Sequence, residues 1–136
     1  MSECAPIVGL QAFLLVGIGA ISGACLRVTI LLYLKFVFPT NYLATLSVNI
    51  LASFLLGLIY GLPNNCIYDW SLSPFMLLIG VGFLGSLSTF SAFIFELCEL
   101  LYTKRLKHFA SLLFASLLGG LIAIKIGYSL TSVPID

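Results

Sequence analysis

The chain has 136 residues, of which 61% are hydrophobic and 8% are charged, and its formal net charge at pH 7 is +1. A soluble domain carries about 25% charged residues, so this composition excludes a water-facing surface and indicates that lipid is the solvent. There is no basic face interleaved with aromatic residues, which argues against a nucleic-acid partner.

Four long segments have the composition of membrane-spanning helices. Residues 7–26, 42–62 and 71–95 contain no charged side chain, and the run 109–124 is free of charge up to Lys125. A bilayer core requires about 20 apolar residues per helix, and Lys125 can extend to the interface from near a helix end. The sequence therefore predicts an all-α integral membrane protein with spans at about 7–34, 42–62, 73–101 and 109–131. Residues 1–136 are expected to form one four-helix transmembrane channel domain.

The basic residues are unevenly divided between the two sides of the expected topology. The first and third connections share one side, which holds Arg27, Lys35, Lys104, Arg105 and Lys107, whereas Lys125 belongs to the other. The positive-inside rule predicts that these two connections are cytoplasmic and that both termini lie outside.

The second span carries a row of small and polar residues. Thr45, Asn49 and Ser53 recur at intervals of four, followed by Gly57 and Gly61, so they share one helix face. One interpretation is close packing between membrane helices. The other is a polar track through a pore, with Asn49 offering an amide N–H near mid-membrane, and both can hold at once.

The third span contains a break signal. Residues 80–85 read GVGFLG, a literal GxGxxG, but no soluble strand–helix unit surrounds it, which excludes dinucleotide binding. The next residues, 85–93, place a helix-weakening glycine and four hydroxyls in an apolar span. Interrupted backbone at that depth is tolerated only where it is buried in protein or lines a cavity. We therefore predict a third helix that is broken mid-membrane.

Two aromatic and two charged residues are further candidates. Phe90 and Phe93 are three residues apart and share a face; their positive ring edges can replace part of a small anion's hydration, although ordinary packing would give the same spacing. Arg27 and Glu96 lie in or beside spans, where charges are costly. Arg27 could reach the interface, and Glu96 could face a pore mouth or a helix contact.

These motifs resemble the CrcB/Fluc family of fluoride channels over nearly the whole chain. Residues 19–27 are similar to the family's glycine–alanine–arginine motif, and residues 45–49 to its Thr-Leu-x-Val-Asn. Residues 82–93, followed by Glu96, are similar to G-x-x-G-G-x-T-T-F-S-T-F and the glutamate after it.

The resemblance implies a passive, fluoride-selective channel, not an enzyme, which exports fluoride across a bacterial plasma membrane and reduces its toxicity. It implies an antiparallel dimer, either of two copies or with an oppositely oriented relative. The implied fluoride pathway comprises Asn49, Thr89, Phe90, Phe93 and Ser116. Backbone carbonyls of Gly85 and Ser88 from both protomers would hold a structural sodium ion (Na+), which is not transported, and Arg27 and Glu96 would have structural roles.

The chain departs from the family pattern near the implied ion sites. Ser86 replaces a glycine, Ser88 and Ala92 replace threonines, and Leu112 replaces a frequent tyrosine. Because Ser88 would bind through its carbonyl, sodium binding should survive. Ala92 removes a hydroxyl, which affects the expected conductance.

Two other functions are compatible with a small four-helix membrane protein. Small multidrug exporters depend on a glutamate in their first span, and residues 7–26 contain no carboxylate. A non-transporting scaffold would need only the glycine pairs Gly19/Gly23 and Gly57/Gly61, but would not need hydroxyls clustered at mid-span. No nucleophile–base pair or metal cluster at recognisable spacing indicates an enzyme.

Overall fold

The computed structural model describes residues 9–38, 41–62 and 73–132, and its regular elements in these ranges are helices. In chain order they are α1 (Leu10–Val37), α2 (Asn41–Gly61), η2 (Met76–Leu84), α3 (Gly85–Leu87), α4 (Phe90–Tyr102) and α5 (Leu106–Thr131). The element η2 has the wider π-helical winding, and with α3 and α4 it makes the third crossing of the molecule.

Four helical segments of the described chain are long and apolar enough to cross a membrane: Leu10–Val37, Tyr42–Gly61, Met76–Tyr102 and Leu106–Thr131. At 1.5 Å of rise per residue, about 20 residues span the hydrocarbon core. The predicted all-helical membrane architecture is therefore confirmed at the level of four apolar helices. The predicted first span begins at residue 7, and residues 7 and 8 lie outside the described part of the chain.

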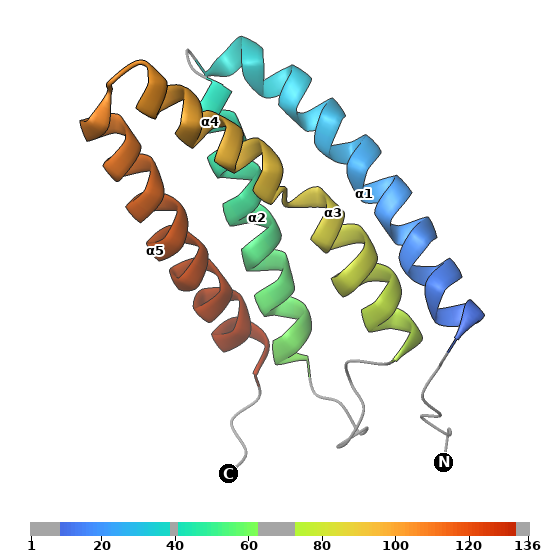
Figure 1. The fold of residues 1–136 in the computed structure, drawn as a ribbon. Coiled ribbons are helices and arrows are strands. Elements are labelled where there is room, and N and C mark those ends of the chain that lie inside the picture. Colours follow the sequence, from blue (N-terminus) through green and yellow to red (C-terminus); the bar gives the residue numbers. More distant parts are fainter. Residues whose placement is uncertain (1–8, 39–40, 63–72, 133–136) are drawn as a thin grey trace.

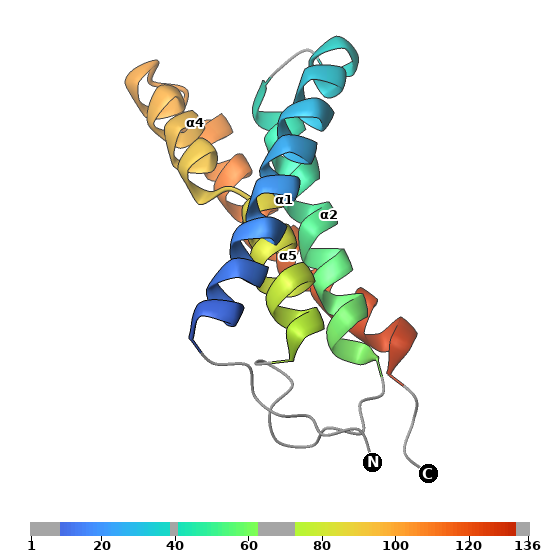
Figure 2. The same cartoon turned by 90° about the vertical axis from the view of Figure 1, so that its right-hand side faces the viewer.

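The helices alternate in direction, so the end of α2 and the end of α5 lie at the same end of the molecule as the start of α1 (Figure 1). Two pairs make the most extensive contacts, α2 with α5 and α1 with η2. The third crossing changes neighbours along its length. Its first part, η2 and α3, packs against α1, whereas α4 packs against α5 and α2 and diverges from α1 (Figure 2).

Glycines set the close approach within both pairs. A Cβ at Gly23 on α1 would overlap the backbone carbonyl of Phe83 on η2, and a Cβ at Gly57 on α2 would overlap that of Ile124 on α5. Helix association in lipid depends on such close packing because the hydrophobic effect does not separate helix from lipid. The glycine pairs predicted as packing elements therefore join each helix to its main neighbour.

Two clusters of buried apolar residues lie on either side of the interruption. The first contains Val48, Ala52, Leu84 and Leu87. The second contains Phe93, Leu97, Leu100 and Leu112. Helix α2 contributes to both clusters, because Leu46 packs against the second. Helix α2 thus contacts both halves of the third crossing, although the first half packs mainly against α1.

Candidate functional site

The third crossing leaves the helical conformation at two residues. Ser88 has φ −75° and ψ 140°, and Thr89 has φ −133° and ψ 117°, which are extended values. The Ser88 N–H still donates to the Leu84 carbonyl at 3.0 Å, and α4 begins at Phe90. Figure 1 shows the corresponding bend between α3 and α4. The depth of this segment in a bilayer stays a prediction.

Asn49 on α2 satisfies the backbone at this point. The Thr89 N–H donates to Asn49 Oδ1 at 3.1 Å. In a continuous α-helix this N–H would donate to the carbonyl four residues earlier, that of Gly85. The Asn49 side chain therefore supplies the acceptor that a continuous helix would provide, and its amide oxygen Oδ1 faces the Thr89 backbone.

Hydroxyl groups cluster around the same segment. Thr89 Oγ1 and Ser91 Oγ lie 3.1 Å apart in hydrogen-bond contact, and Ser53 Oγ donates to the backbone carbonyl of Asn49 at 3.0 Å. The side chain of Thr89 is buried. Asn49, Thr89 and Ser91 thus form a contiguous polar group between α2 and the start of α4, in a molecule that is otherwise largely apolar.

Phe90 and Phe93 lie side by side at the start of α4, with ring centroids 6.4 Å apart and ring planes inclined by 47°. Their surroundings differ. Phe93 is 7% exposed and packs with Leu97, Leu100 and Leu112, whereas Phe90 is 76% exposed. Their spacing predicts that both rings share one face, but in this chain only Phe93 is enclosed by protein.

A second polar contact joins α2 to α4. Thr45 Oγ1 donates to Glu96 Oε1 at 2.6 Å, and the two residues are 4% and 8% exposed. No described residue makes a hydrogen bond to the other carboxyl oxygen of Glu96, which is buried. The structure places Glu96 at a contact between α2 and α4. A short hydrogen bond to a buried carboxyl group is strong, so this contact fixes α4 against α2.

Arg27 contacts Ser86, which lies two residues ahead of the extended Ser88. Its guanidinium Nη1 donates to the Ser86 carbonyl at 3.3 Å, and the Ser86 hydroxyl donates to the Phe83 carbonyl at 3.1 Å. Arg27 is half-buried. The cation therefore lies at the C-terminal end of α3, where carbonyls without helical partners attract positive charge. This is a packing contact between α1 and α3 as well as an electrostatic one.

The backbone of Gly85 and Ser88 flanks α3. Gly85 is exposed, and the nearest atom to a Cβ built there is the Gly80 carbonyl oxygen at 3.9 Å. The donor that would normally satisfy the Gly85 carbonyl, the Thr89 N–H, is directed to Asn49. Ser88 is half-buried and extended. The two carbonyls thus lie at the start of α3 and directly after its end, where the interruption begins.

Ser116 is half-buried on α5, one turn after Leu112. Within the described helices, no hydrogen bond links Ser116 to Asn49 or Thr89. Ser116 is therefore less directly connected to the polar group at the interruption than Asn49 and Thr89 are to each other.

A hollow of about 230 Å³ opens beside Leu112, between the starts of α2 and α5. It is lined by Tyr42, Leu43, Leu46, His108, Ser111, Leu112 and Ala115.

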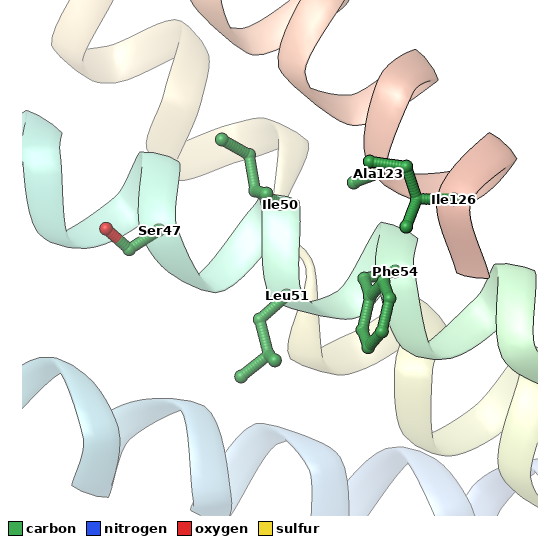
Figure 3. A pocket seen from close by; sticks show the side chains of 6 residues that line it. All are labelled: Ser47, Ile50, Leu51, Phe54, Ala123 and Ile126. Atoms are coloured by element: carbon green, nitrogen blue, oxygen red, sulfur yellow. The ribbon is translucent and has the colours of Figure 1, made fainter. Parts of the chain in front are cut away.

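A larger hollow of about 490 Å³ lies further along α2 and α5. Figure 3 shows its lining side chains, Ser47, Ile50, Leu51 and Phe54 from α2 and Ala123 and Ile126 from α5. These α2 residues occupy the face opposite to Asn49, as their spacing requires. Since Ser47 supplies the polar side chain of this lining, the hollow offers few donors to an anion and is separate from the polar group at Asn49.

The sequence pattern alone did not reveal two of these contacts. The spacing predicts that Thr45 lies on the polar face of α2, but its pairing with Glu96 depends on how α2 and α4 are rotated about their axes. The contact of Ser91 with Thr89 depends on the extended backbone between α3 and α4. The available signal was the presence of isolated polar residues in apolar spans, since such residues find partners on neighbouring helices.

Comparison with known proteins matches most of the chain to one family. The family described as "CrcB-like protein, Camphor Resistance (CrcB)" matches residues 14–128. A relative from Prochlorococcus marinus, named "Fluoride-specific ion channel FluC 1", is 42% identical over 118 residues, which cover 87% of this chain and 90% of the relative. Relatives named as fluoride-specific ion channels from Parasynechococcus marenigrum and Alteromonas mediterranea are 44% and 37% identical, over 86% and 87% of this chain and 90% and 95% of their own lengths. The chain therefore belongs to the CrcB-like family, and it is a multi-pass membrane protein.

Proposed function

We propose that this protein is a passive, fluoride-selective channel and not an enzyme. The observation that carries the proposal is the 42–44% identity, over most of the chain, to relatives named fluoride-specific ion channels. The polar group at the interruption supports it, because the group provides hydrogen-bond donors where an apolar helix would provide none. The relatives are bacterial, which favours a bacterial plasma membrane and export of fluoride from the cytoplasm.

The proposed fluoride pathway follows Asn49, Thr89, Phe90, Phe93 and Ser116. Fluoride is small and strongly hydrated, so the pore must replace water with donors and still bind weakly enough to release the ion. Asn49 Oδ1 accepts from Thr89, which orients the amide toward that backbone and leaves its N–H groups to act as donors elsewhere. The ring edges of the two phenylalanines carry the positive end of the aromatic quadrupole.

A dimer accounts for the exposed ring of Phe90. With 76% of its surface uncovered in one protomer, Phe90 would extend into the pore region of a partner. We propose an antiparallel arrangement, with interrupted third helices meeting at mid-membrane depth. The partner is a second copy or an oppositely oriented relative, and the uneven division of basic residues makes the second case worth testing.

The backbone near the interruption fits the sodium ion that the family resemblance implies. Sodium prefers oxygen ligands, and unwound backbone and half-helix C-terminal ends supply them in membrane proteins. The Gly85 carbonyl has lost its usual helical donor to Asn49, and Gly85 is exposed. Gly85 and Ser88 of each protomer would hold the ion, which would supply positive charge that holds two interrupted helices together.

The direct test is fluoride efflux from liposomes that contain the purified protein. We expect rapid fluoride loss, followed with a fluoride electrode, while chloride-loaded vesicles retain their anion. Equal loss of both anions would contradict selectivity. Absence of efflux from correctly folded protein would be followed by co-reconstitution with an oppositely oriented relative, and absence of efflux there too would reject the channel and favour a scaffold.

A further inference from the structure

The interruption of the third crossing leaves carbonyls at the end of α3 that need donors from outside the helix. In a continuous helix the Ser86 carbonyl would accept from the N–H of Phe90. The extended residues Ser88 and Thr89 stand between the two. Arg27 Nη1 on α1 donates to the Ser86 carbonyl at 3.3 Å. A guanidinium group from a neighbouring helix therefore supplies a donor where the helix is broken.

Arg27 carries a positive charge that the described helices do not neutralise. In the part of the chain that the structure describes, its guanidinium forms no ion pair, and its partner is a carbonyl. The two carboxylates in that part, Glu96 and Glu99, both belong to α4, beyond the interruption. The Arg27 side chain is half-buried. Water and salt screen such a charge less than an exposed one, so it acts on groups several ångströms away.

This charge lies beside the two residues proposed to hold sodium. Ser86, which Arg27 contacts, is covalently bonded to Gly85 and lies two residues ahead of Ser88. At 1.5 Å of rise per residue, the three residues fall within one helical turn. Carbonyls at the C-terminal end of a helix attract cations, and two cations at the same end repel each other. The guanidinium group and a sodium ion would therefore oppose each other at one end of α3.

We propose that Arg27 sets the affinity and the charge selectivity of this cation site. The inference rests on the sodium ion of the proposed function and adds a residue that regulates its binding. Arg27 positions the end of α3 through the Ser86 carbonyl, while its charge weakens cation binding. Because Coulomb energy is proportional to charge, the penalty for a divalent ion is twice that for sodium. Arg27 thus favours a monovalent ion at carbonyl ligands that would also suit calcium.

The test measures the dimer fraction of the purified full chain in detergent by analytical ultracentrifugation, as sodium chloride replaces N-methyl-D-glucamine chloride at constant ionic strength. Arg27→Gln keeps an N–H donor for the Ser86 carbonyl and removes the charge. We expect it to lower the sodium concentration for half-maximal dimer about ten-fold, which is roughly the effect of a unit charge on the order of 10 Å away at an effective dielectric constant of about 20. Arg27→Lys keeps the charge and should restore the wild-type value.

Calcium gives a second measurement on the same variants. Arg27→Gln should lower the calcium concentration for half-maximal dimer about a hundred-fold, the square of the sodium effect, because the charge of the ion is doubled. The wild-type chain should need more calcium than sodium, which tests the selectivity without any substitution. Lys35→Gln is the matched control, since it removes the same charge from the exposed last turn of α1, about 12 Å along the axis from Arg27. It should change neither concentration.

The outcomes separate this inference from the sodium site on which it rests. A wild-type dimer that is independent of sodium would remove the ion from the proposed function, and this role of Arg27 with it. A sodium-dependent wild type whose half-maximal concentration is the same in Arg27→Gln would reject the role of Arg27 alone. A thermal midpoint lowered equally at every sodium concentration would then identify a packing contact. An equal shift in Lys35→Gln, or a wild-type dimer that forms with less calcium than sodium, would also overturn the proposal.

Discussion

At the scale of single residues, the two phenylalanines differ in a way that their spacing conceals. Phe90 is exposed and Phe93 is packed in the second apolar cluster. We expect both Phe90→Ile and Phe93→Ile to abolish fluoride efflux, because each removes a positive ring edge and keeps an apolar side chain. Phe90→Ile should leave the thermal midpoint unchanged, whereas Phe93→Ile should lower it through imperfect packing. Full efflux in both variants would reject the pathway assignment.

Asn49 has two separable roles. Asn49→Asp keeps an oxygen to accept the Thr89 N–H but removes the amide donors and adds negative charge. We expect helix content and thermal midpoint close to the wild type and fluoride efflux reduced at least about ten-fold, which corresponds to about 1.4 kcal/mol in the barrier. Ser53→Ala, on the same face of α2, serves as the control and should retain most of the flux. Normal flux in Asn49→Asp would show that the residue serves the fold alone.

At the scale of helices, the Thr45–Glu96 contact connects α2 to α4. Thr45→Val preserves the volume of the side chain but leaves Glu96 Oε1 without its donor. Removing one partner of a buried hydrogen bond costs about 1–3 kcal/mol. We therefore expect a lower unfolding midpoint in detergent, measured by circular dichroism during heating. An unchanged midpoint would show that water or another residue replaces Thr45 without cost.

The packing of α1 offers a matched pair of glycine substitutions. Gly23→Ala introduces a methyl group that would overlap the Phe83 carbonyl, whereas a Cβ at Gly17 meets no atom within 4 Å. We expect Gly23→Ala to destabilise the protein and shift α1 away from η2, and Gly17→Ala to have little effect. The measurement is the thermal midpoint of the two variants in the same detergent. Equal midpoints would contradict the close approach of these helices.

The sequence predicted the helices better than their mutual orientation, and the reason is physical. The charge-free runs identify four spans because a bilayer tolerates few charges over about 20 residues. Their ends shift by a few residues, as for α1, which continues to Val37, since flanking residues such as Phe36 are equally apolar. Hydropathy does not fix helix rotation when all faces are apolar. The contacts of Thr45 with Glu96 and of Asn49 with Thr89 therefore required the structure, although each residue was a candidate by type.

At the scale of the whole molecule, the chain exposes large apolar side chains on all of its long helices, and Gly85, just ahead of the interruption, is exposed as well. A dimer closed around sodium would satisfy both, and it predicts a dependence on the cation. A ligand present at about 100 times its dissociation constant stabilises the bound state by about 2.7 kcal/mol. We expect replacement of sodium by N-methyl-D-glucamine to lower both the dimer fraction, measured by analytical ultracentrifugation, and the fluoride flux. Gly17→Ala is the matched control, because a Cβ there meets no atom within 4 Å and Gly17 on α1 is not among the residues proposed to hold the ion; its sodium dependence should equal that of the wild type. A dimer and a flux that are both indifferent to sodium would remove the ion from the assembly and leave helix packing alone to hold the two protomers together.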